Sequence, residues 1–303
     1  MRWKLLLAAL CIQQFLFAQN NIVMDASKAK DTINKNIYGH FAEHLGHCIY
    51  DGIYIGEKNI PNKNGIRLDV VEALKKLKVP VLRWPGGCFA DTYHWKEAIG
   101  PKDKRKHITN ITWGNVREDN SFGTHEFLDF CEMIGAEPYL AVNMASGSVQ
   151  EAMEWVQYVN QPNGTGNLPD LRLENGRSKP WNVKYWGIGN ESWDCGGNMT
   201  VDYYINEYKK YATLMTSYSN TEKLFRIAVG PGTEDYNWTE TVMKGVPAKR
   251  IEGLSIHHYS VINWSKKGSA TQFSEEEYFK TMEQAWRMER IVTKNSEVMD
   301  KYD

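Results

Sequence analysis

The sequence has no excess of charge of either sign. Lys and Arg together number 36, against 37 Asp and Glu, which leaves a formal net charge of -1. There is also no basic stripe of the kind that holds nucleic acid or an anionic membrane surface. We therefore expect neither nucleic acid nor a membrane as a partner, and we predict a neutral ligand.

Cysteine is scarce and shows no metal-binding spacing. Beyond the N-terminal segment the chain has Cys48, Cys88, Cys131 and Cys195, which lie far apart and form no Cys-x-x-Cys pair. This pattern fits neither a zinc ribbon nor a disulfide scaffold, and we expect no metal and no cofactor. Aromatic residues, by contrast, are plentiful, and their faces can pack on sugars as well as fill a core.

No apolar run in the sequence is long enough to span a membrane. The longest begins after the basic start Met1 to Lys4, covers residues 5–17 and ends at Ala18, before polar residues. A basic start, a short apolar stretch and a small residue are typical of a secretory signal peptide. The sequence thus predicts a signal peptide over residues 1–18 and a secreted or periplasmic protein.

The remaining chain alternates strand-like apolar runs with stretches of helical periodicity. One helix face is formed by Val70, Leu74 and Leu77, and others are expected at residues 149–156, 201–218 and 275–299. Such alternation predicts a parallel sheet covered by helices. We count six strand-then-helix units, with strands ending near residues 37–40, 81–84, 139–143, 185–190, 227–230 and 254–258. The stretch 161–179, rich in Gly and Pro, is expected to be a long loop away from the site.

Polar residues at the strand ends distinguish a closed barrel from an open sheet. An open sheet has one crevice, whereas here nearly every predicted strand is followed by polar side chains, as in a barrel whose loops converge on one mouth. These residues are His40, Glu43, Arg83, Asn143, Asn190, Glu191, His257 and Tyr259. The pattern therefore favours a (β/α)8-type barrel.

Glu191 is the first candidate for chemistry. It follows the apolar run 183–188 within Gly189-Asn190-Glu191, and the carboxyl end of a barrel strand is where an acid/base catalyst lies. The amide of Asn190 could bind a sugar hydroxyl next to the scissile bond. The alternative is a carboxylate that only caps the next helix.

Two further strand ends carry functional candidates. Arg83 precedes Gly86 and Gly87, which permit a tight turn, so its guanidinium would point inward at a carboxylate, either catalytic or in a structural salt bridge. His257 and Tyr259 share one face of their strand because side chains alternate in direction. They would position a carboxylate or a sugar hydroxyl, or else form a hydrogen-bonded core pair.

The segment from His40 to His44 spells His-x-x-Glu-His. On a helix this is an inverted zinc-peptidase motif. Here Gly39 and Gly46 bracket it, a strand-like run precedes it, and no helical apolar stripe crosses it. We therefore reject metal binding at this segment.

At this point the chain resembles the α-L-arabinofuranosidases of glycoside hydrolase family 51. The resemblance rests on four blocks in the family's order, residues 37–46, 83–87, 189–191 and 257–259, and it extends from about Asn20 to the end. It implies a TIM barrel whose acid/base follows strand four and whose nucleophile follows strand seven. It also implies a substrate of arabinose-containing plant polysaccharide or oligosaccharide, no cofactor, and a parent protein that is a homo-oligomer.

The resemblance also assigns roles to single residues. Glu191 becomes the general acid/base, and Asn190, Glu43 and Trp113 become ligands of the arabinose. Cys88 stands at a substrate-binding position where several members have Asn. Finally, the resemblance makes Arg83, His257 and Tyr259 supports of the nucleophile.

The nucleophile itself has no counterpart in the sequence. The family has a Glu-Trp-Gly segment after strand seven, and no Glu-Trp pair follows His258. We therefore expect an incomplete barrel of about six of eight units over residues 37–303, preceded by a strand segment at 19–36 that would pair with an absent C-terminal β-sandwich. Retaining hydrolysis needs two carboxyl groups about 5 to 5.5 Å apart, so we predict little or no turnover by these 303 residues.

Two other functions stay open from the sequence. Another retaining barrel glycosidase, such as a xylanase or β-glucanase, would cut inside a polymer through an open cleft, whereas Glu43 and Trp113 suggest a pocket for one sugar. A non-catalytic sugar-binding remnant would bind arabino-oligosaccharide without cleaving it.

Overall fold

The structure is a computed structural model that describes residues 22–218 and 223–302. The predicted signal peptide lies outside the described residues. The chain divides into two units, residues 1–37 and 38–303. In the first unit the described residues contain the short 3-10 helix η1 (Ala26–Lys28) and the start of η2 (Lys35–Tyr38), and none of these described residues lies in a strand.

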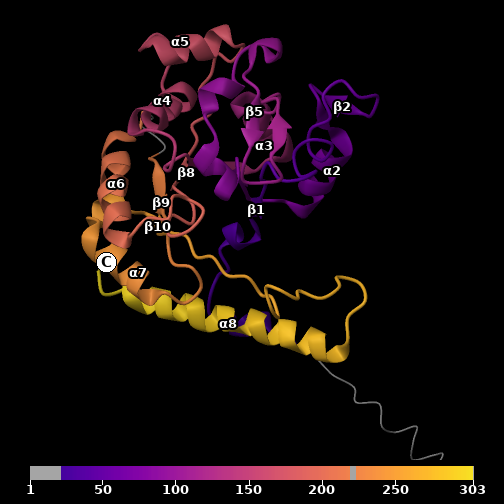
Figure 1. The fold of residues 1–303 in the computed structure, drawn as a ribbon, viewed down its shortest axis with the longest axis vertical. Coiled ribbons are helices and arrows are strands. Elements are labelled where there is room, and N and C mark those ends of the chain that lie inside the picture. The colour runs from indigo at the N-terminus through magenta and orange to yellow at the C-terminus, as the bar shows by residue number, and fades with distance from the viewer. Residues whose placement is uncertain (1–21, 219–222, 303) are drawn as a thin grey trace, which may run out of the picture. The chain divides into compact units, whose positions relative to one another are not determined.

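The second unit is built on one six-stranded parallel sheet (Figure 1). Its strands, in spatial and chain order, are β1 (His40–Phe41), β4 (Val81–Trp84), β7 (Glu137–Val142), β8 (Tyr185–Ile188), β9 (Phe225–Ala228) and β10 (Gly253–Leu254). Each strand pairs in parallel with the next one along the chain. Stepwise parallel order of this kind is that of a (β/α) barrel, and it confirms the predicted arc of six units.

Helices connect the strands and pack on one another along the outside of the arc. They are α2 (Leu68–Leu77), α3 (Thr124–Ile134), α4 (Val149–Asn160), α5 (Asn167–Glu174), α6 (Val201–Leu214), α7 (Tyr236–Gly245) and α8 (Glu275–Met299). Side-chain caps define several of their starts: Ser148 caps α4 and Thr200 caps α6. Ser274 and Glu277 form a capping box on α8. No helix in the described residues is long and apolar enough to cross a membrane.

Two predicted boundaries were wrong. Residues 35–38 form η2, and the first strand begins only at His40, so His40 starts the strand that it was expected to end. The stretch 161–179 is not an irregular loop, because it contains α5, whose Leu168 and Leu171 pack on the core. Pro169 lies in the first turn of α5, where a missing N–H costs nothing.

Aromatic side chains fill the space between the sheet and its helices. Trp84 of β4 and Trp186 of β8 are fully buried. Trp84 stacks on Phe127 of α3 with ring centroids 4.8 Å apart, and Trp155 of α4 meets Trp186 edge to face at 5.8 Å. These rings belong to the core, where they pack strands β4 and β8 against helices α3 and α4.

Two hairpins lie in the connections near the first strands. One pairs β2 (Asn62–Lys63) with β3 (Ile66–Arg67), and the other pairs β5 (Ile108–Asn110) with β6 (Val116–Glu118). The second hairpin belongs to the long connection from the carboxyl end of β4 to α3. It carries Trp113 in its turn.

Candidate active site

Glu191 lies in the loop that follows β8, the fourth strand of the sheet. Its backbone φ is 39°, and that of Gly189 is 85°, so both residues adopt the left-handed conformation. A Cβ at Gly189 would meet Ser192 Oγ at 2.9 Å and Met144 Sδ at 3.0 Å, so only glycine fits. A left-handed glutamate is unusual, and such backbone strain is concentrated at functional sites.

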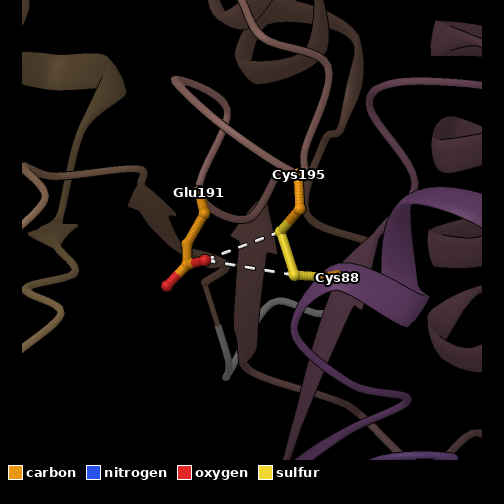
Figure 2. A group of neighbouring side chains, drawn as sticks. All are labelled: Cys88, Glu191 and Cys195. Carbon is orange, nitrogen blue, oxygen red and sulfur yellow. Dashed lines mark hydrogen bonds between the residues drawn. A yellow bond between two sulfur atoms is a disulfide. The ribbon is translucent and has the colours of Figure 1, made fainter. Parts of the chain in front are cut away.

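The carboxylate of Glu191 is held by His257, which follows β10. Nδ1 of His257 lies 2.7 Å from Oε1 of Glu191, and both side chains are largely buried. The family resemblance assigned His257 to the nucleophile, whereas in the described structure its ring contacts the acid/base candidate. The other oxygen, Oε2, faces Cys195 and Cys88 (Figure 2).

Asn190 is buried beside Glu191 and is held by Arg83 from β4. Nη2 of Arg83 donates to Oδ1 of Asn190 over 2.7 Å. The guanidinium also lies over the rings of Phe41 and Tyr139, at 4.9 and 5.6 Å from their centroids. Because Oδ1 is occupied, the amide NH2 of Asn190 is left as a donor. Arg83 thus fixes which hydrogen-bonding group Asn190 presents.

Glu43 follows β1 and is buried, with its carboxylate turned towards the loop after β4. Its Oε1 accepts the backbone N–H groups of Gly87 over 2.8 Å and Phe89 over 3.1 Å. A Cβ at Gly86 would come within 2.7 Å of Oε1, so this glycine makes room for the carboxylate. A Cβ at Gly87 would lie 3.4 Å from the amide of Asn190 and 3.6 Å from Oε1 of Glu43, which places both side chains beside one turn.

The His-x-x-Glu-His segment does not form a zinc site. Its residues are not helical, and His44 is buried in a separate network. Nε2 of His44 accepts the indole N–H of Trp84 over 3.1 Å, so Nδ1 carries the proton and faces Glu118 Oε2 at 3.3 Å. Glu43 is turned to backbone amides instead. The segment therefore lacks the helical geometry of a zinc-peptidase motif, and its His44 and Glu43 contact other groups.

Tyr259 is exposed, and Trp113 is partly buried in the turn of the second hairpin. Tyr259 is 58% exposed and meets Trp264 edge to face at 5.0 Å. Desolvation and the negative charges of Glu191 and Glu43 raise the pKa of Tyr259. The indole Nε1 of Trp113 is buried without an acceptor among the described residues.

Asp91 is a functional candidate that was not predicted from the sequence. It is buried, and its Oδ1 accepts the backbone N–H groups of Met144 over 2.9 Å and Ala145 over 3.2 Å. Burial raises its pKa to about 7. Asp91 joins the loop after β4 to the loop after β7. Its sequence context, Phe-Ala-Asp-Thr, gave no signal for this role.

A disulfide between Cys88 and Cys195 was also not predicted from the sequence. The bridge joins the loop after β4 to the loop after β8, with the two Cα atoms 5.5 Å apart. The cysteines are 107 residues apart in the chain, and no spacing motif marks them. The sulfur of Cys88, which was expected at a substrate-binding position, is therefore bonded to Cys195.

Fold and site together define a class of protein. A parallel (β/α) arc presents a glutamate after its fourth strand, next to an asparagine held by an arginine from the second strand. A carboxylic acid at the carboxyl end of a barrel strand, beside an amide that can bind a sugar hydroxyl, is an arrangement found in barrel glycoside hydrolases.

Comparison with known proteins identifies the family. The family described as "Alpha-L-arabinofuranosidase 1 domain" matches residues 73–277. A relative from Bacteroides ovatus, named "Intracellular exo-alpha-L-arabinofuranosidase", is 50% identical over 309 residues, covering 100% of this chain and 60% of the relative. "Alpha-L-arabinofuranosidase C" of Emericella nidulans is 52% identical over 161 residues, covering 53% of this chain and 32% of the relative.

Solved structures agree with the sequence relatives. The family 51 arabinofuranosidase of Xanthomonas axonopodis pv. citri superposes with a TM-score of 0.88 at 42% identity, over 92% of this chain and 56% of that one. An α-L-arabinofuranosidase from Thermotoga maritima, solved with arabinose, gives a TM-score of 0.77 at 38% identity, over 88% and 52%. The chain belongs to the α-L-arabinofuranosidases of glycoside hydrolase family 51, and it spans little more than half the length of these relatives.

One prediction from the sequence is contradicted by these relatives. We expected a secreted or periplasmic protein, but the Bacteroides ovatus protein, which matches the whole of this chain, is named as intracellular. A basic start with a short apolar run predicted export from composition alone. The residues concerned lie outside those that the structure describes.

Proposed function

We propose that this chain supplies the acid/base half of a retaining α-L-arabinofuranosidase. The whole enzyme would release terminal, non-reducing α-L-arabinofuranosyl residues from arabinan or arabinoxylan side chains. The observation that carries the proposal is the placement of Glu191. It follows the fourth strand, its carboxylate is fixed by His257, and Asn190 lies beside it under the control of Arg83.

In the first step Glu191 protonates the glycosidic oxygen while a nucleophile attacks the anomeric carbon. In the second step the same carboxylate removes a proton from water, which hydrolyses the glycosyl-enzyme. The NH2 group of Asn190 donates to a hydroxyl oxygen of the sugar. Since Oε1 of Glu43 is occupied by two backbone amides, Oε2 remains to accept a sugar hydroxyl.

The second carboxylate is proposed to come from a segment outside these 303 residues. Between residues 259 and 302 every carboxylate lies on α8 or at its C-cap Asp300, and none follows a strand. Nε of Arg83 is buried and finds no acceptor among the described residues. A buried donor of this kind calls for a partner, and a nucleophile carboxylate is an acceptor of the expected charge.

The division of the chain is part of the proposal. We assign residues 37–303 to the barrel and 19–36 to a segment that pairs with a C-terminal β-sandwich, in keeping with the division between residues 37 and 38. The parent protein is proposed to be a homo-oligomer. Its substrate would be arabino-oligosaccharide met inside the cell, as the name of the Bacteroides ovatus relative suggests.

The test uses aryl arabinofuranosides whose leaving groups differ in acidity. In a longer protein that includes the remaining barrel strands, Glu191→Ala should lower kcat/KM by roughly 10²–10⁴-fold for poor leaving groups and leave kcat/KM of the most activated substrate nearly unchanged, because kcat/KM reports the first step and only poor leaving groups need a proton there. The 303-residue chain alone should show little turnover. A uniform loss across all leaving groups would remove Glu191 from the acid role.

Two outcomes would favour other functions. Faster hydrolysis of xylosides than of arabinofuranosides by the longer protein would indicate a different glycosidase. Calorimetric binding of arabino-oligosaccharide with no hydrolysis by any form would indicate a sugar-binding protein.

A further inference from the structure

Three potential metal ligands meet at the mouth of the site. Oε2 of Glu191 lies 3.5 Å from Sγ of Cys195 and 4.0 Å from Sγ of Cys88 (Figure 2). Together these side chains form a group of the composition and closeness that can hold a metal ion. In the disulfide form neither sulfur carries a proton or a negative charge, so the contact serves no evident purpose for the carboxylate.

The distances fit tetrahedral zinc once the bridge is reduced. With Zn–S of about 2.3 Å and Zn–O of about 2.0 Å, a tetrahedral site has S···O edges of roughly 3.5 Å and an S···S edge of roughly 3.8 Å. The two S···O separations already lie at 3.5 and 4.0 Å. Only the sulfur atoms must separate, and a Cα–Cα distance of 5.5 Å allows this by side-chain rotation.

The surroundings support the three ligands in this role. His257 holds Oε1 of Glu191, which leaves Oε2 directed at the sulfurs, and a ligand carboxylate fixed by an outer hydrogen bond is typical of metal sites. The amide Nδ2 of Asn190 lies 3.8 Å from Sγ of Cys195, where it can donate to a thiolate. Cys195 is exposed, so both a reductant and a cation can reach the pair.

We propose that Cys88, Cys195 and Glu191 form a binding site for a thiophilic divalent cation, such as Zn²⁺, when the disulfide is reduced. A dithiol reductant supplies two electrons and two protons and is itself oxidised to a disulfide. The bridge between Cys88 and Cys195 becomes two thiols. Cation binding then releases both thiol protons and forms two M–S bonds and one M–O bond. Water completes the fourth position.

The site would control the chemistry next to it. A cation on Oε2 of Glu191 occupies the oxygen that carries the proton for the leaving group, so the metal-bound form is inactive. This consequence rests on the proposed function, whereas cation binding itself does not. Oxidation to the disulfide removes both thiolates and protects Glu191 from metal. In a reducing compartment the reduced form, and with it the metal site, is the one to expect.

The experiment measures metal binding without any turnover. The chain is reduced with a water-soluble phosphine, which becomes its oxide, and is then titrated with Co²⁺. We expect one equivalent to give near-ultraviolet sulfur-to-cobalt charge-transfer absorption and visible bands of a tetrahedral site. One equivalent of Zn²⁺ should displace it. The oxidised chain should give no such spectrum.

Variants decide which residues are ligands. Cys88→Ser and Cys195→Ser should each lose most of the charge-transfer absorption, and Glu191→Gln should weaken Zn²⁺ binding at least tenfold. Cys48→Ser, which changes an exposed free cysteine, is the matched control and should leave both readouts unchanged.

Three outcomes would overturn the proposal: no stoichiometric Co²⁺ spectrum in the reduced chain, a spectrum that survives both serine variants, or equal Zn²⁺ affinity of Glu191→Gln and the parent chain. A failure of the hydrolase proposal is seen instead with the aryl arabinofuranosides. The two proposals therefore stand or fall on separate measurements.

Discussion

Nδ1 of His257 lies 2.7 Å from Oε1 of Glu191, although 66 residues separate them in the chain. The contact joins the end of β10 to the loop after β8, across the intervening strand β9. It ties the orientation of the carboxylate that we propose as the acid/base to a different strand. His257 is therefore a positioning residue for Glu191.

Replacement of His257 should reproduce a weaker form of the Glu191 defect. In a longer protein with the full barrel, His257→Ala should lower kcat/KM by roughly 10- to 100-fold for poor leaving groups, because the acid is less well placed. Activated leaving groups should be affected less. Steady-state kinetics on both kinds of aryl arabinofuranoside check this, and equal losses on the two would contradict it. His258→Ala, one residue away and bonded to the backbone oxygen of Gln284, is the control.

A methyl group at Gly86 should displace Glu43. The added Cβ would lie 2.7 Å from both Cγ and Oε1 of Glu43, too close for the carboxylate to remain in place. We expect Gly86→Ala to weaken arabinose binding at least tenfold, measured by calorimetry. Gly166→Ala meets only the amide of the partly buried Gln161, at 3.4 Å, and should bind as the parent does. Unchanged affinity in Gly86→Ala would remove Glu43 from the sugar site.

Asp91 should make stability fall as the pH rises. Its pKa is raised from 3.8 to about 7 in the folded chain, so between these values the folded state binds more protons than the unfolded state, and the free energy of unfolding decreases with pH. A pKa difference of about 3 corresponds to about 4 kcal/mol. Asp91→Asn should lack this contribution. Urea unfolding at several values between about pH 4 and 8 gives the difference in free energy of unfolding between the two proteins. This difference should change in favour of the variant as pH rises. A difference that does not change with pH would contradict the raised pKa of Asp91.

The buried ion pair of Arg105 and Glu126 should be costly to break. The guanidinium makes two bonds of 3.0 Å to the carboxylate, and Glu126 also caps α3 through the N–H of Gly123. Arg105→Met removes both guanidinium bonds from the buried carboxylate and leaves it only the longer contact with Lys102, at 3.6 Å, so we expect a loss of about 3 kcal/mol in the free energy of unfolding. Lys106, which pairs with Glu97 at the surface, is the control.

The control pair is exposed, so Lys106→Met should cost no more than about 1 kcal/mol. Urea unfolding measures both variants. Equal losses in the two would mean that burial does not distinguish the pairs.

The parallel arc could be predicted from the sequence because the hydrophobic period and the composition of each segment indicate whether that segment forms a strand or a helix. Five of the six predicted strands, such as 81–84 and 185–190, match the observed strand within a residue or two of its start. The first strand was misplaced because Ile37 and Tyr38 look like strand residues, yet they lie in η2. Helix α5 was missed because its glycine-rich flanks hid Leu168 and Leu171, whose packing on the core gives it stability.

Contacts between distant loops could not be predicted from the sequence. Arg83 was expected to point at a carboxylate, whereas its guanidinium donates to the amide of Asn190, and this bond depends on the register of β4, β7 and β8. The pairing of Cys88 with Cys195 and the position of Asp91 likewise follow from how the loops meet. No local pattern in the sequence records such a meeting.

Because the backbone at Glu191 is left-handed, the residue that would best stabilise the fold at this position differs from the residue that the proposed activity needs. A glutamate at φ 39° has a conformation that glycine or asparagine would adopt more readily. Selection for heat resistance alone would therefore favour Glu191→Gly, at the expense of the carboxylate. Laboratory evolution that screens only for residual fold after heating is expected to discard the carboxylate that we propose as the acid/base, so a screen for stabilised variants of this chain should hold position 191 fixed.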